Sequence, residues 1–362
     1  MRIAVMAPLV TPIAEPNVGG SQALLADLAV GLAGRGHDVA VYAASGSSID
    51  GVDVVDTGVD PASLAATLFR ANREGGAPGD SRAARDAFER SAVLVAGRGA
   101  DIVHVHAFDG PAVDAAATLP FPIVQVLHLP PVPDVAAAVR RAPERLAVVT
   151  VSRWMESAWR AAGIPSTVIP NGVPVERIPW GAEGGREVLF AGRLSPEKGT
   201  IEALEIASRA GAPIRVVGGP YDPRYAEAVE AWGDRPGVSL EGPVPRRRLW
   251  ELMSEARAVL CPVRWDEPFG LVAAESQAAG APVIGFRRGA LEEVVADGVT
   301  GALVPEGDLD GAARAVSGAG RFDRSACRRH AEETLDLERT LDGYEELSVR
   351  LVETARGVGT GR

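Results

Sequence analysis

The stretch Glu267-Pro-Phe-Gly-Leu-Val-Ala-Ala-Glu275 decides the fold of this chain. Its two carboxylates stand eight residues apart, and between them a Phe-Gly pair opens an apolar run of helical character. A strand-like run, Ala258–Cys261, precedes it, and another, Val283–Phe286, follows. The order strand, loop, helix, strand predicts an α/β unit, with Glu267 in the loop and Glu275 one turn into the helix.

A helix start of this kind suits a nucleotide that is joined through phosphates to a sugar. The N-terminus of a helix presents unpaired N–H groups and a partial positive charge, and Gly270 allows the backbone to approach a ligand closely. Glu275 can accept two hydroxyl hydrogen bonds, as from the vicinal diol of ribose, while Glu267 can face a second polyol or a developing positive charge. The alternative is an ordinary amphipathic helix, with Glu275 in solvent and Glu267 as a loop charge.

Length and composition indicate a soluble protein of two domains. The 362 residues are 46% apolar and 23% charged, which allows two domains with a core each. The net charge of −11 argues against nucleic acid as a main partner. The two cysteines, Cys261 and Cys327, are too few for a disulfide framework or a CxxC metal site, which favours a reducing compartment. No apolar run approaches the ~20 residues of a membrane span, so we expect a cytoplasmic protein.

Short β-rich runs alternate with helical patterns along most of the chain, which predicts parallel sheets covered by helices. The strand Ile3–Ala7 leads through a Gly19-Gly20 loop to a helix at Ser21–Ala33. The pattern restarts with the strand Glu187–Ala191, a glycine-bearing turn and a helix at Thr200–Ala210. Further strands are expected at Val39–Ala43, Ile102–His106, Ile123–Leu127, Ala147–Val151, Thr167–Ile169 and Ile214–Val217.

The repeated pattern predicts two doubly wound, Rossmann-like domains that face each other across a cleft, where the carboxyl ends of both sheets would form the site. We expect residues 1–170 to form the first domain, residues 171–186, which are rich in Pro and Gly, to form a linker, and residues 187–334 to form the second domain. A last helix is expected within residues 335–362. Ser45–Pro61 and Asn72–Ser81 are expected to be surface loops.

The turn Gly192-Arg-Leu-Ser-Pro-Glu-Lys-Gly199 lies between a strand and a helix and carries two cations. Arg193 offers a planar fork for phosphate oxygens, and Lys198 adds a point charge. Two cations at this position would stabilise a diphosphate leaving group as negative charge builds on it. The alternative is a solvated basic loop.

Weaker signals lie in the first half of the chain. Gly20 and its neighbours could bring backbone N–H groups to a phosphate or sugar, or could form a simple turn with Ser21 as the helix N-cap. His104 and His106 alternate at the end of a strand, and we expect them to point to opposite sides of the sheet. One of them, or His128 after the next strand, could bind a sugar hydroxyl or phosphate; the alternative is a buried structural histidine.

Two charged clusters are interpreted as structural. Asp308-Leu-Asp310 matches the DxD pattern of some metal-dependent sugar transferases, but it stands at an apparent helix start, so we expect a capping pair without a metal. Arg246-Arg247-Arg248 also opens a helical segment, and we expect it to be a solvated face.

These motifs together resemble the retaining glycosyltransferases of family 4, which have the GT-B fold. The Glu–seven–Glu motif combined with the Arg/Lys turn is specific, whereas either alone is not. The resemblance covers nearly the whole chain and is carried by the Gly19-Gly20 loop, Asp101–His106, Asn171-Gly172-Val173, Gly192–Gly199, Glu267–Glu275, Ala279–Val283, Glu293-Val-Val and Asp297–Gly301.

The resemblance assigns the donor site to the second domain. It implies that Arg193 and Lys198 hold the donor diphosphate and that Glu275 binds the ribose hydroxyls. It also implies that Glu267 holds the donor sugar and its phosphate together with three backbone N–H groups, those of Phe269, Gly270 and Leu271. The family usually needs no metal and no separate cofactor.

The resemblance assigns the acceptor side to the first domain, onto which the final helix would cross back. His106 matches the position that contacts the donor sugar near the reacting centre, and Gly20 matches the loop near the acceptor and the phosphate. The chain departs from the family pattern at Ser276-Gln277-Ala278, where Ala-Met-Ala is frequent, and at His128, which is followed by Leu-Pro-Pro instead of glycine.

We therefore expect retaining, metal-independent transfer of a sugar from a nucleoside-diphosphate sugar to a hydroxyl acceptor. Two alternatives stay open: a sugar-nucleotide epimerase of the same fold, which needs no acceptor, and a non-catalytic protein that binds a sugar nucleotide. The sequence leaves open the base, the donor sugar, the acceptor, the linkage, the oligomeric state and any peripheral contact with a membrane.

Overall fold

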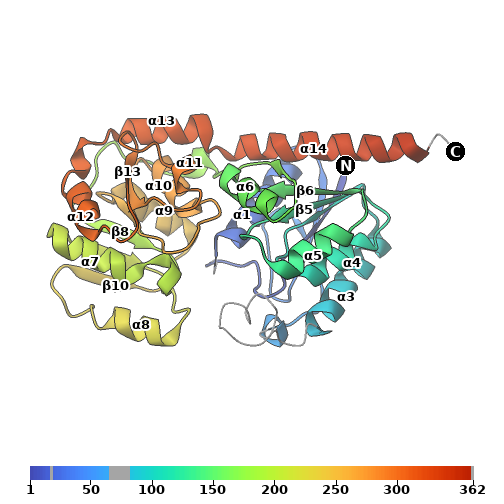
Figure 1. Ribbon diagram of the computed structural model, residues 1–362, viewed down its shortest axis with the longest axis horizontal. Coiled ribbons are helices and arrows are strands. Elements are labelled where there is room, and N and C mark those ends of the chain that lie inside the picture. The colour runs from blue at the N-terminus through green and yellow to red at the C-terminus, as the bar shows by residue number, and fades with distance from the viewer. Residues whose placement is uncertain (17–18, 65–81, 360–362) are drawn as a thin grey trace. The chain divides into compact units, whose positions relative to one another are not determined.

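The computed structural model describes residues 1–16, 19–64 and 82–359, and it divides the chain into two compact units. Unit 1 comprises Met1–Ala14, Ser21–Pro170 and Thr340–Arg362, and unit 2 comprises Glu15–Gly20 and Asn171–Arg339. Each unit is built around one parallel sheet with helices packed against it (Figure 1). The predicted α/β class with doubly wound parallel sheets is confirmed. The expected loop at Asn72–Ser81 lies outside the described residues.

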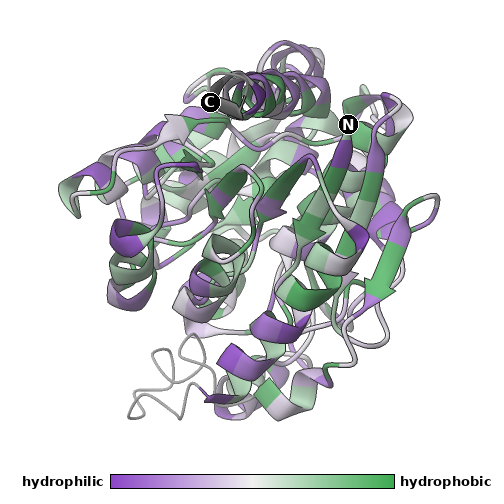
Figure 2. Ribbon diagram, turned by 90° about the vertical axis from the view of Figure 1, so that its right-hand side faces the viewer, coloured by the Kyte–Doolittle hydropathy of each residue, from purple (hydrophilic) through white to green (hydrophobic). Residues whose placement is uncertain are grey.

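The sheet of unit 1 has seven parallel strands in the order β3-β2-β1-β4-β5-β6-β7. The strands are β1 (Arg2–Met6), β2 (Asp38–Ala43), β3 (Asp53–Asp56), β4 (Ile102–Val105), β5 (Ile123–Leu127), β6 (Leu146–Thr150) and β7 (Thr167–Val168). The helices are α1 (Gly20–Gly34), α3 (Arg82–Arg98), α4 (Gly110–Ala117), α5 (Pro133–Arg141), α6 (Arg153–Ala161) and α14 (Leu337–Gly359), with a 3-10 turn η1 (Pro61–Leu64). The central strands β4 and β5 are buried at every position, as expected of strands covered on both faces. Figure 2 shows the strands as largely apolar and polar residues gathered on the outer helices.

The sheet of unit 2 has six parallel strands in the order β10-β9-β8-β11-β12-β13. The strands are β8 (Val188–Ala191), β9 (Ile214–Val217), β10 (Val238–Glu241), β11 (Val259–Cys261), β12 (Val283–Phe286) and β13 (Gly301–Val304). The helices are α7 (Thr200–Ala210), α8 (Pro223–Glu230), α9 (Arg246–Glu255), α10 (Leu271–Ala278), α11 (Leu291–Val294), α12 (Leu309–Ser317) and α13 (Arg324–Thr334), with 3-10 turns η2 (Val175–Arg177), η3 (Pro196–Lys198) and η4 (Ala319–Arg321). Helix α7 packs against α12, whereas α10 packs against α9 and α13.

Three strands are additions to those expected from the sequence. β3 lies inside Ser45–Pro61, so the expectation of a loop there is wrong over these four residues; β10 and β13 were not expected either. All three are edge strands of their sheets. An edge strand has one neighbour only, and β3 and β10 keep partly exposed, polar positions that break the apolar run by which a buried strand is found.

Helix α14 begins close to Val173. The Val173 N–H donates to the carbonyl of Leu335 at 2.8 Å, and the Val173 carbonyl accepts from the N–H of Leu337 at 2.9 Å. From Thr340 onward the helix belongs to unit 1, where the Thr340 hydroxyl donates to the carbonyl of Pro170 at 2.9 Å. This helix therefore closes unit 1 with residues from the far end of the chain.

Candidate functional site

The turn after β8 carries both cations that the sequence singles out. The Arg193 guanidinium lies 4.5 Å from the centre of the Tyr221 ring, and its Nη2 stands 3.6 Å from Glu197 Oε1. Lys198 Nζ stands 2.8 Å from Glu267 Oε2. Their side chains are 21% and 22% exposed, so neither is a fully solvated loop charge.

Glu267 lies in the loop between β11 and α10, as the sequence predicts. Its Oε2 accepts two hydrogen bonds, from Lys198 Nζ at 2.8 Å and from Trp265 Nε1 at 2.7 Å. Lys198 Nζ also lies 5.0 Å from the centre of the Trp265 ring. Gly270 precedes α10 with φ of +100°, in the left-handed region that favours glycine. Helix α10 then begins at Leu271, one residue after the Phe269-Gly270 pair.

Glu275 lies on α10 and is 5% exposed, which excludes the interpretation of a solvent carboxylate. Its Oε1 accepts from Arg246 Nε at 2.7 Å and from Trp250 Nε1 at 3.0 Å. The expectation that the three arginines at the start of α9 form a solvated face is wrong for Arg246, whose side chain is 11% exposed, whereas Arg247 is 88% exposed. Arg246 and Trp250 stand four residues apart, the spacing that places two side chains on one helix face.

The two positions at which α10 departs from the family pattern are buried and hydrogen-bonded. The Ser276 hydroxyl donates to the carbonyl of Ala281 at 2.9 Å, and the Gln277 amide donates to the carbonyl of Val294 at 2.6 Å. Each of these side chains therefore ties α10 to the segment that follows it. The departure from the family pattern changes how the helix is anchored and leaves Glu275 on the same helix.

A second polar cluster lies inside unit 1 around the end of β4. His106 Nδ1 stands 2.9 Å from His128 Nε2, and His104 Nε2 stands 2.9 Å from the Ser348 hydroxyl of α14. The expectation that His104 and His106 point to opposite sides is wrong. Residues two apart on a strand share a face, and both rings lie against Tyr344, with ring centres 5.6 and 6.2 Å from it.

The histidine rings of this cluster are uncharged at neutral pH. Burial lowers the pKa of His104 and that of His128 to about 4. Burial also lowers the pKa of His106 well below its usual value, and the neighbouring His128 and His104 lower it further. A neutral ring has one N–H donor and one acceptor nitrogen, so the three rings can bind polar groups without adding charge.

The remaining candidates are placed as follows. Gly20 is the first residue of α1. Asp308 accepts a hydrogen bond from the Gly311 N–H at 2.8 Å as the N-cap of α12, which confirms a capping role, while Asp310 pairs with Arg209 at 2.8 Å on the surface. Over residues 1–16, 19–64 and 82–359, no group of three or more His, Cys, Asp or Glu side chains is placed to hold a metal ion.

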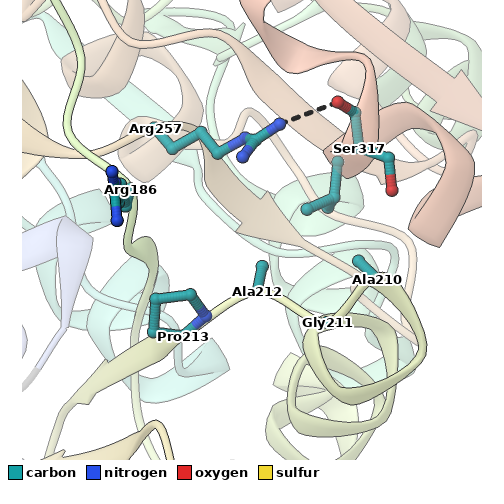
Figure 3. Close-up of a pocket in the computed structure, with 8 residues that line it drawn as sticks. Arg186, Ala210, Gly211, Ala212, Pro213, Arg257 and Ser317 are labelled. Carbon is teal, nitrogen blue, oxygen red and sulfur yellow. Dashed lines mark hydrogen bonds between the residues drawn. The ribbon is translucent and has the colours of Figure 1, made fainter.

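A pocket of about 480 Å³ lies at the other end of the strands of unit 2, lined by residues such as Arg186, Pro213 and Arg257 that precede β8, β9 and β11 (Figure 3). Arg257 donates there to the carbonyl of Ser317 at 2.7 Å. Ligands of parallel α/β sheets bind at the carboxyl ends of the strands. Arg193, Lys198 and Glu267 lie at that end of the sheet, whereas this pocket lies at the opposite end.

Comparison with known proteins agrees with the fold and with the motifs. Residues 18–177 match the family described as Glycosyltransferase Family 4, and residues 176–319 match Glycosyl transferases group 1. D-inositol 3-phosphate glycosyltransferase of Mycobacterium avium (strain 104) is 28% identical, with 99% of this chain and 97% of the relative covered. A glycogen synthase of Mycobacterium tuberculosis is 32% identical over 46% of this chain and 42% of its own length.

Solved structures show the same fold. Sucrose-phosphate synthase from Thermosynechococcus elongatus superposes with a TM-score of 0.79 at 18% identity, over 98% of this chain and 99% of that one. Anabaena HepE, solved in complex with UDP-glucose, superposes with a TM-score of 0.74 at 19% identity, over 96% of this chain and 100% of that one. The chain is a glycosyltransferase of the GT-B fold. Within that class it belongs to glycosyltransferase family 4.

No helix in the described part of the chain is both long and apolar enough to cross a membrane.

Proposed function

We propose that this glycosyltransferase takes its sugar from a nucleoside-diphosphate sugar and transfers it to a hydroxyl acceptor, with retention at the anomeric carbon and without a metal ion. The observation that carries the proposal is the pairing of Lys198 with Glu267 at 2.8 Å, beside Arg193 and the start of α10. Positive side chains and a helix N-terminus suit a diphosphate, and the carboxylate suits a sugar. A relative of the same fold, Anabaena HepE, has been solved with UDP-glucose, which supports this donor class.

Each part of the donor has a partner in unit 2. The ammonium group of Lys198 has three N–H donors, so it can keep its bond to Glu267 and still bind a phosphate oxygen. Arg193 can bind two phosphate oxygens with its planar fork. The backbone N–H groups of Phe269, Gly270 and Leu271 add the helix N-terminus. Glu275 accepts hydrogen bonds from the ribose hydroxyls.

The chemical step breaks the bond between the anomeric carbon and the diphosphate oxygen, and the electron pair leaves with the diphosphate. Lys198 and Arg193 stabilise the negative charge that develops there, and Glu267 stabilises the positive charge on the sugar ring. The acceptor hydroxyl attacks from the face that the diphosphate leaves, and its proton passes to the departing phosphate oxygen. Retention then needs no covalent intermediate, and the two cations take the part that a metal ion plays in metal-dependent transferases.

In unit 1 we assign His106 and His128 to the acceptor side and to the sugar near the reacting centre. His106 is 1% exposed and His128 is 9% exposed. His128 therefore has the better access to a substrate, and His106 holds its ring through the 2.9 Å contact. Both rings are neutral, so they act as hydrogen-bonding groups rather than as cations.

The test is a time course with UDP-glucose, GDP-mannose, ADP-glucose and dTDP-glucose in EDTA, with and without acceptors. D-inositol 3-phosphate is the first acceptor to try, because full-length relatives carry its name. We expect release of one nucleoside diphosphate and, by NMR, a product with the anomeric configuration of the donor. An isomeric sugar nucleotide would show an epimerase, and binding without turnover would show a non-catalytic protein. An inverted product, or activity that EDTA abolishes, would contradict the proposed mechanism.

A further inference from the structure

Both carboxylates of the Glu–seven–Glu motif are held in the same way. One oxygen of Glu267 accepts from the cation Lys198 and from the indole N–H of Trp265. One oxygen of Glu275 accepts from the cation Arg246 and from the indole N–H of Trp250. In both sets the cation also lies over the indole ring, at 5.0 Å in the first and 4.8 Å in the second.

The set around Glu275 is the more deeply buried. The side chains of Glu275 and Arg246 are 7% and 11% exposed, and Trp250 is 4% exposed. Arg246 is the first residue of α9 and Trp250 lies one turn later, whereas Glu275 lies on α10, which packs against α9. The carboxylate of one helix is therefore oriented by two donors from its neighbour.

We propose that Arg246 and Trp250 are positioning residues for nucleotide recognition: they fix Glu275 through Oε1 and so aim Oε2 at the hydroxyls of the ribose. This inference rests on the proposed function, in which Glu275 binds the ribose. A carboxylate held through one oxygen by two donors from a neighbouring helix cannot rotate freely, so its second oxygen presents one geometry to a ligand. The device makes the enzyme selective for ribonucleotides over 2′-deoxyribonucleotides.

The size of the selectivity follows from the bonds concerned. A hydrogen bond to a charged group changes affinity by about 10- to 100-fold. The wild-type enzyme is therefore expected to bind a ribonucleoside diphosphate about 10- to 100-fold more tightly than its 2′-deoxy analogue. Without Arg246 the Glu275 carboxylate loses its fixed orientation, and this preference falls toward 1. Arg246 touches no reacting atom, so the donor KM should rise while kcat changes little.

The experiment is calorimetric titration of UDP, 2′-deoxy-UDP, GDP and 2′-deoxy-GDP into the full chain. The variants are Arg246→Met, which keeps the length of the side chain without its donors, Arg246→Lys, which restores a cation, and Trp250→Phe, which removes the indole N–H. Arg247→Met is the matched control, because Arg247 is the next residue of the same helix and is 88% exposed.

We expect wild type and Arg247→Met to bind each ribonucleotide more tightly than its 2′-deoxy analogue. This preference should be lost in Arg246→Met, partly restored in Arg246→Lys and weakened in Trp250→Phe. A merely structural role would lower the affinity for both members of a nucleotide pair equally, so an unchanged ratio in Arg246→Met would overturn the inference. If Arg246→Met does not fold, the ratio in Trp250→Phe and Arg246→Lys decides in the same way. A wild-type chain that binds neither these four nucleotides nor ADP or dTDP would overturn the proposed function itself, whereas a wild-type chain that binds dTDP alone would overturn the inference.

Discussion

At the scale of single residues, the site is a set of charges that hold one another in place before any ligand binds. Lys198 bonds Glu267, and Arg246 bonds Glu275, each beside a tryptophan. Preorganised charges of this kind are effective in catalysis because they need little rearrangement when charge develops on the substrate. Lys198 is the residue on which the proposed chemistry depends most.

Replacing Lys198 by alanine should lower kcat by about 100-fold or more, the scale for losing one preorganised stabilising donor. Arg193→Ala should act in the same direction. The measurement is the steady-state rate of nucleotide release from the donor identified in the assay above. Arg264→Ala is the control, since Arg264 belongs to an exposed ion pair with Glu202, 3.0 Å long, in the same region. Near-native turnover in both Lys198→Ala and Arg193→Ala would contradict the assignment.

The buried histidines predict how stability depends on pH. In the folded chain the pKa of His104 is about 4, below the value of about 6.5 for an exposed histidine. As the pH falls, the unfolded chain therefore takes up a proton at His104 before the folded chain does. Protonation at this position leaves the free energy of unfolding unchanged above about pH 6.5 and lowers it progressively between pH 6.5 and pH 4. At pH 5 the loss at His104 alone is about 2 kcal/mol.

Urea unfolding at pH 8 and at pH 5 measures this effect. The difference in the free energy of unfolding between the two pH values should be about 2 kcal/mol smaller in His104→Gln than in wild type, because the variant has no group to titrate at this position. The same pH-dependent loss in both proteins would show that His104 is not the source.

The sequence allows the prediction of single site residues only where a motif marks them. Glu267, Glu275, Arg193 and Lys198 stand in short, contiguous patterns. Arg246 looks like any helix-start arginine, because its partner lies 29 positions further along the chain and is reached only through the packing of α9 on α10.

At the scale of elements, strands and helices in the middle of each sheet follow from the sequence, whereas edges and contacts between elements do not. The central strands are mostly apolar and fully buried in β4 and β5, because helices cover both faces. The edge strands β3 and β10 lack that signature. Two contacts of α14 join residues more than 150 positions apart: Ser348 contacts His104, and Thr340 contacts Pro170. No local pattern in the sequence encodes such contacts.

The start of α14 leaves no room for a side chain at Gly172. A Cβ atom there would lie 2.7 Å from the Asp336 carbonyl and from the Leu337 backbone. Backbone atoms cannot turn aside as a flexible side chain can, so Gly172→Ala should destabilise unit 2 by about 1–3 kcal/mol, the usual cost of overpacking.

Thermal unfolding checks this prediction against Gly34→Ala, a control with no atom within 4 Å of the added Cβ. Gly172→Ala should unfold at least about 2 °C lower than wild type. Gly34→Ala should match wild type or exceed it, since alanine is the better helix former. Equal unfolding temperatures for the two variants would mean that the chain accommodates a side chain at Gly172.

At the scale of the whole molecule, an acidic chain is proposed to bind an anionic donor. The net charge is −11, so overall attraction does not bring the diphosphate to the enzyme. Binding must come from the local set of Arg193, Lys198 and the start of α10. Fold class, enzyme class and family follow from the alternation of strands and helices and from the combined motifs. The base and the acceptor do not, because no motif in the sequence marks residues that would recognise either of them.

The most direct test of the central claim is a thermal-shift panel with UDP, GDP, ADP and dTDP in EDTA, applied to wild type, Lys198→Ala and Arg264→Ala. A ligand at about 100 times its Kd increases the free energy of unfolding of the unit that binds it by about 2.7 kcal/mol, which raises the unfolding temperature by a few degrees. We predict such a shift with one nucleotide in wild type and in Arg264→Ala, and a much smaller shift in Lys198→Ala. No shift with any nucleotide, or an equal shift in all three proteins, would contradict a donor diphosphate site at Lys198.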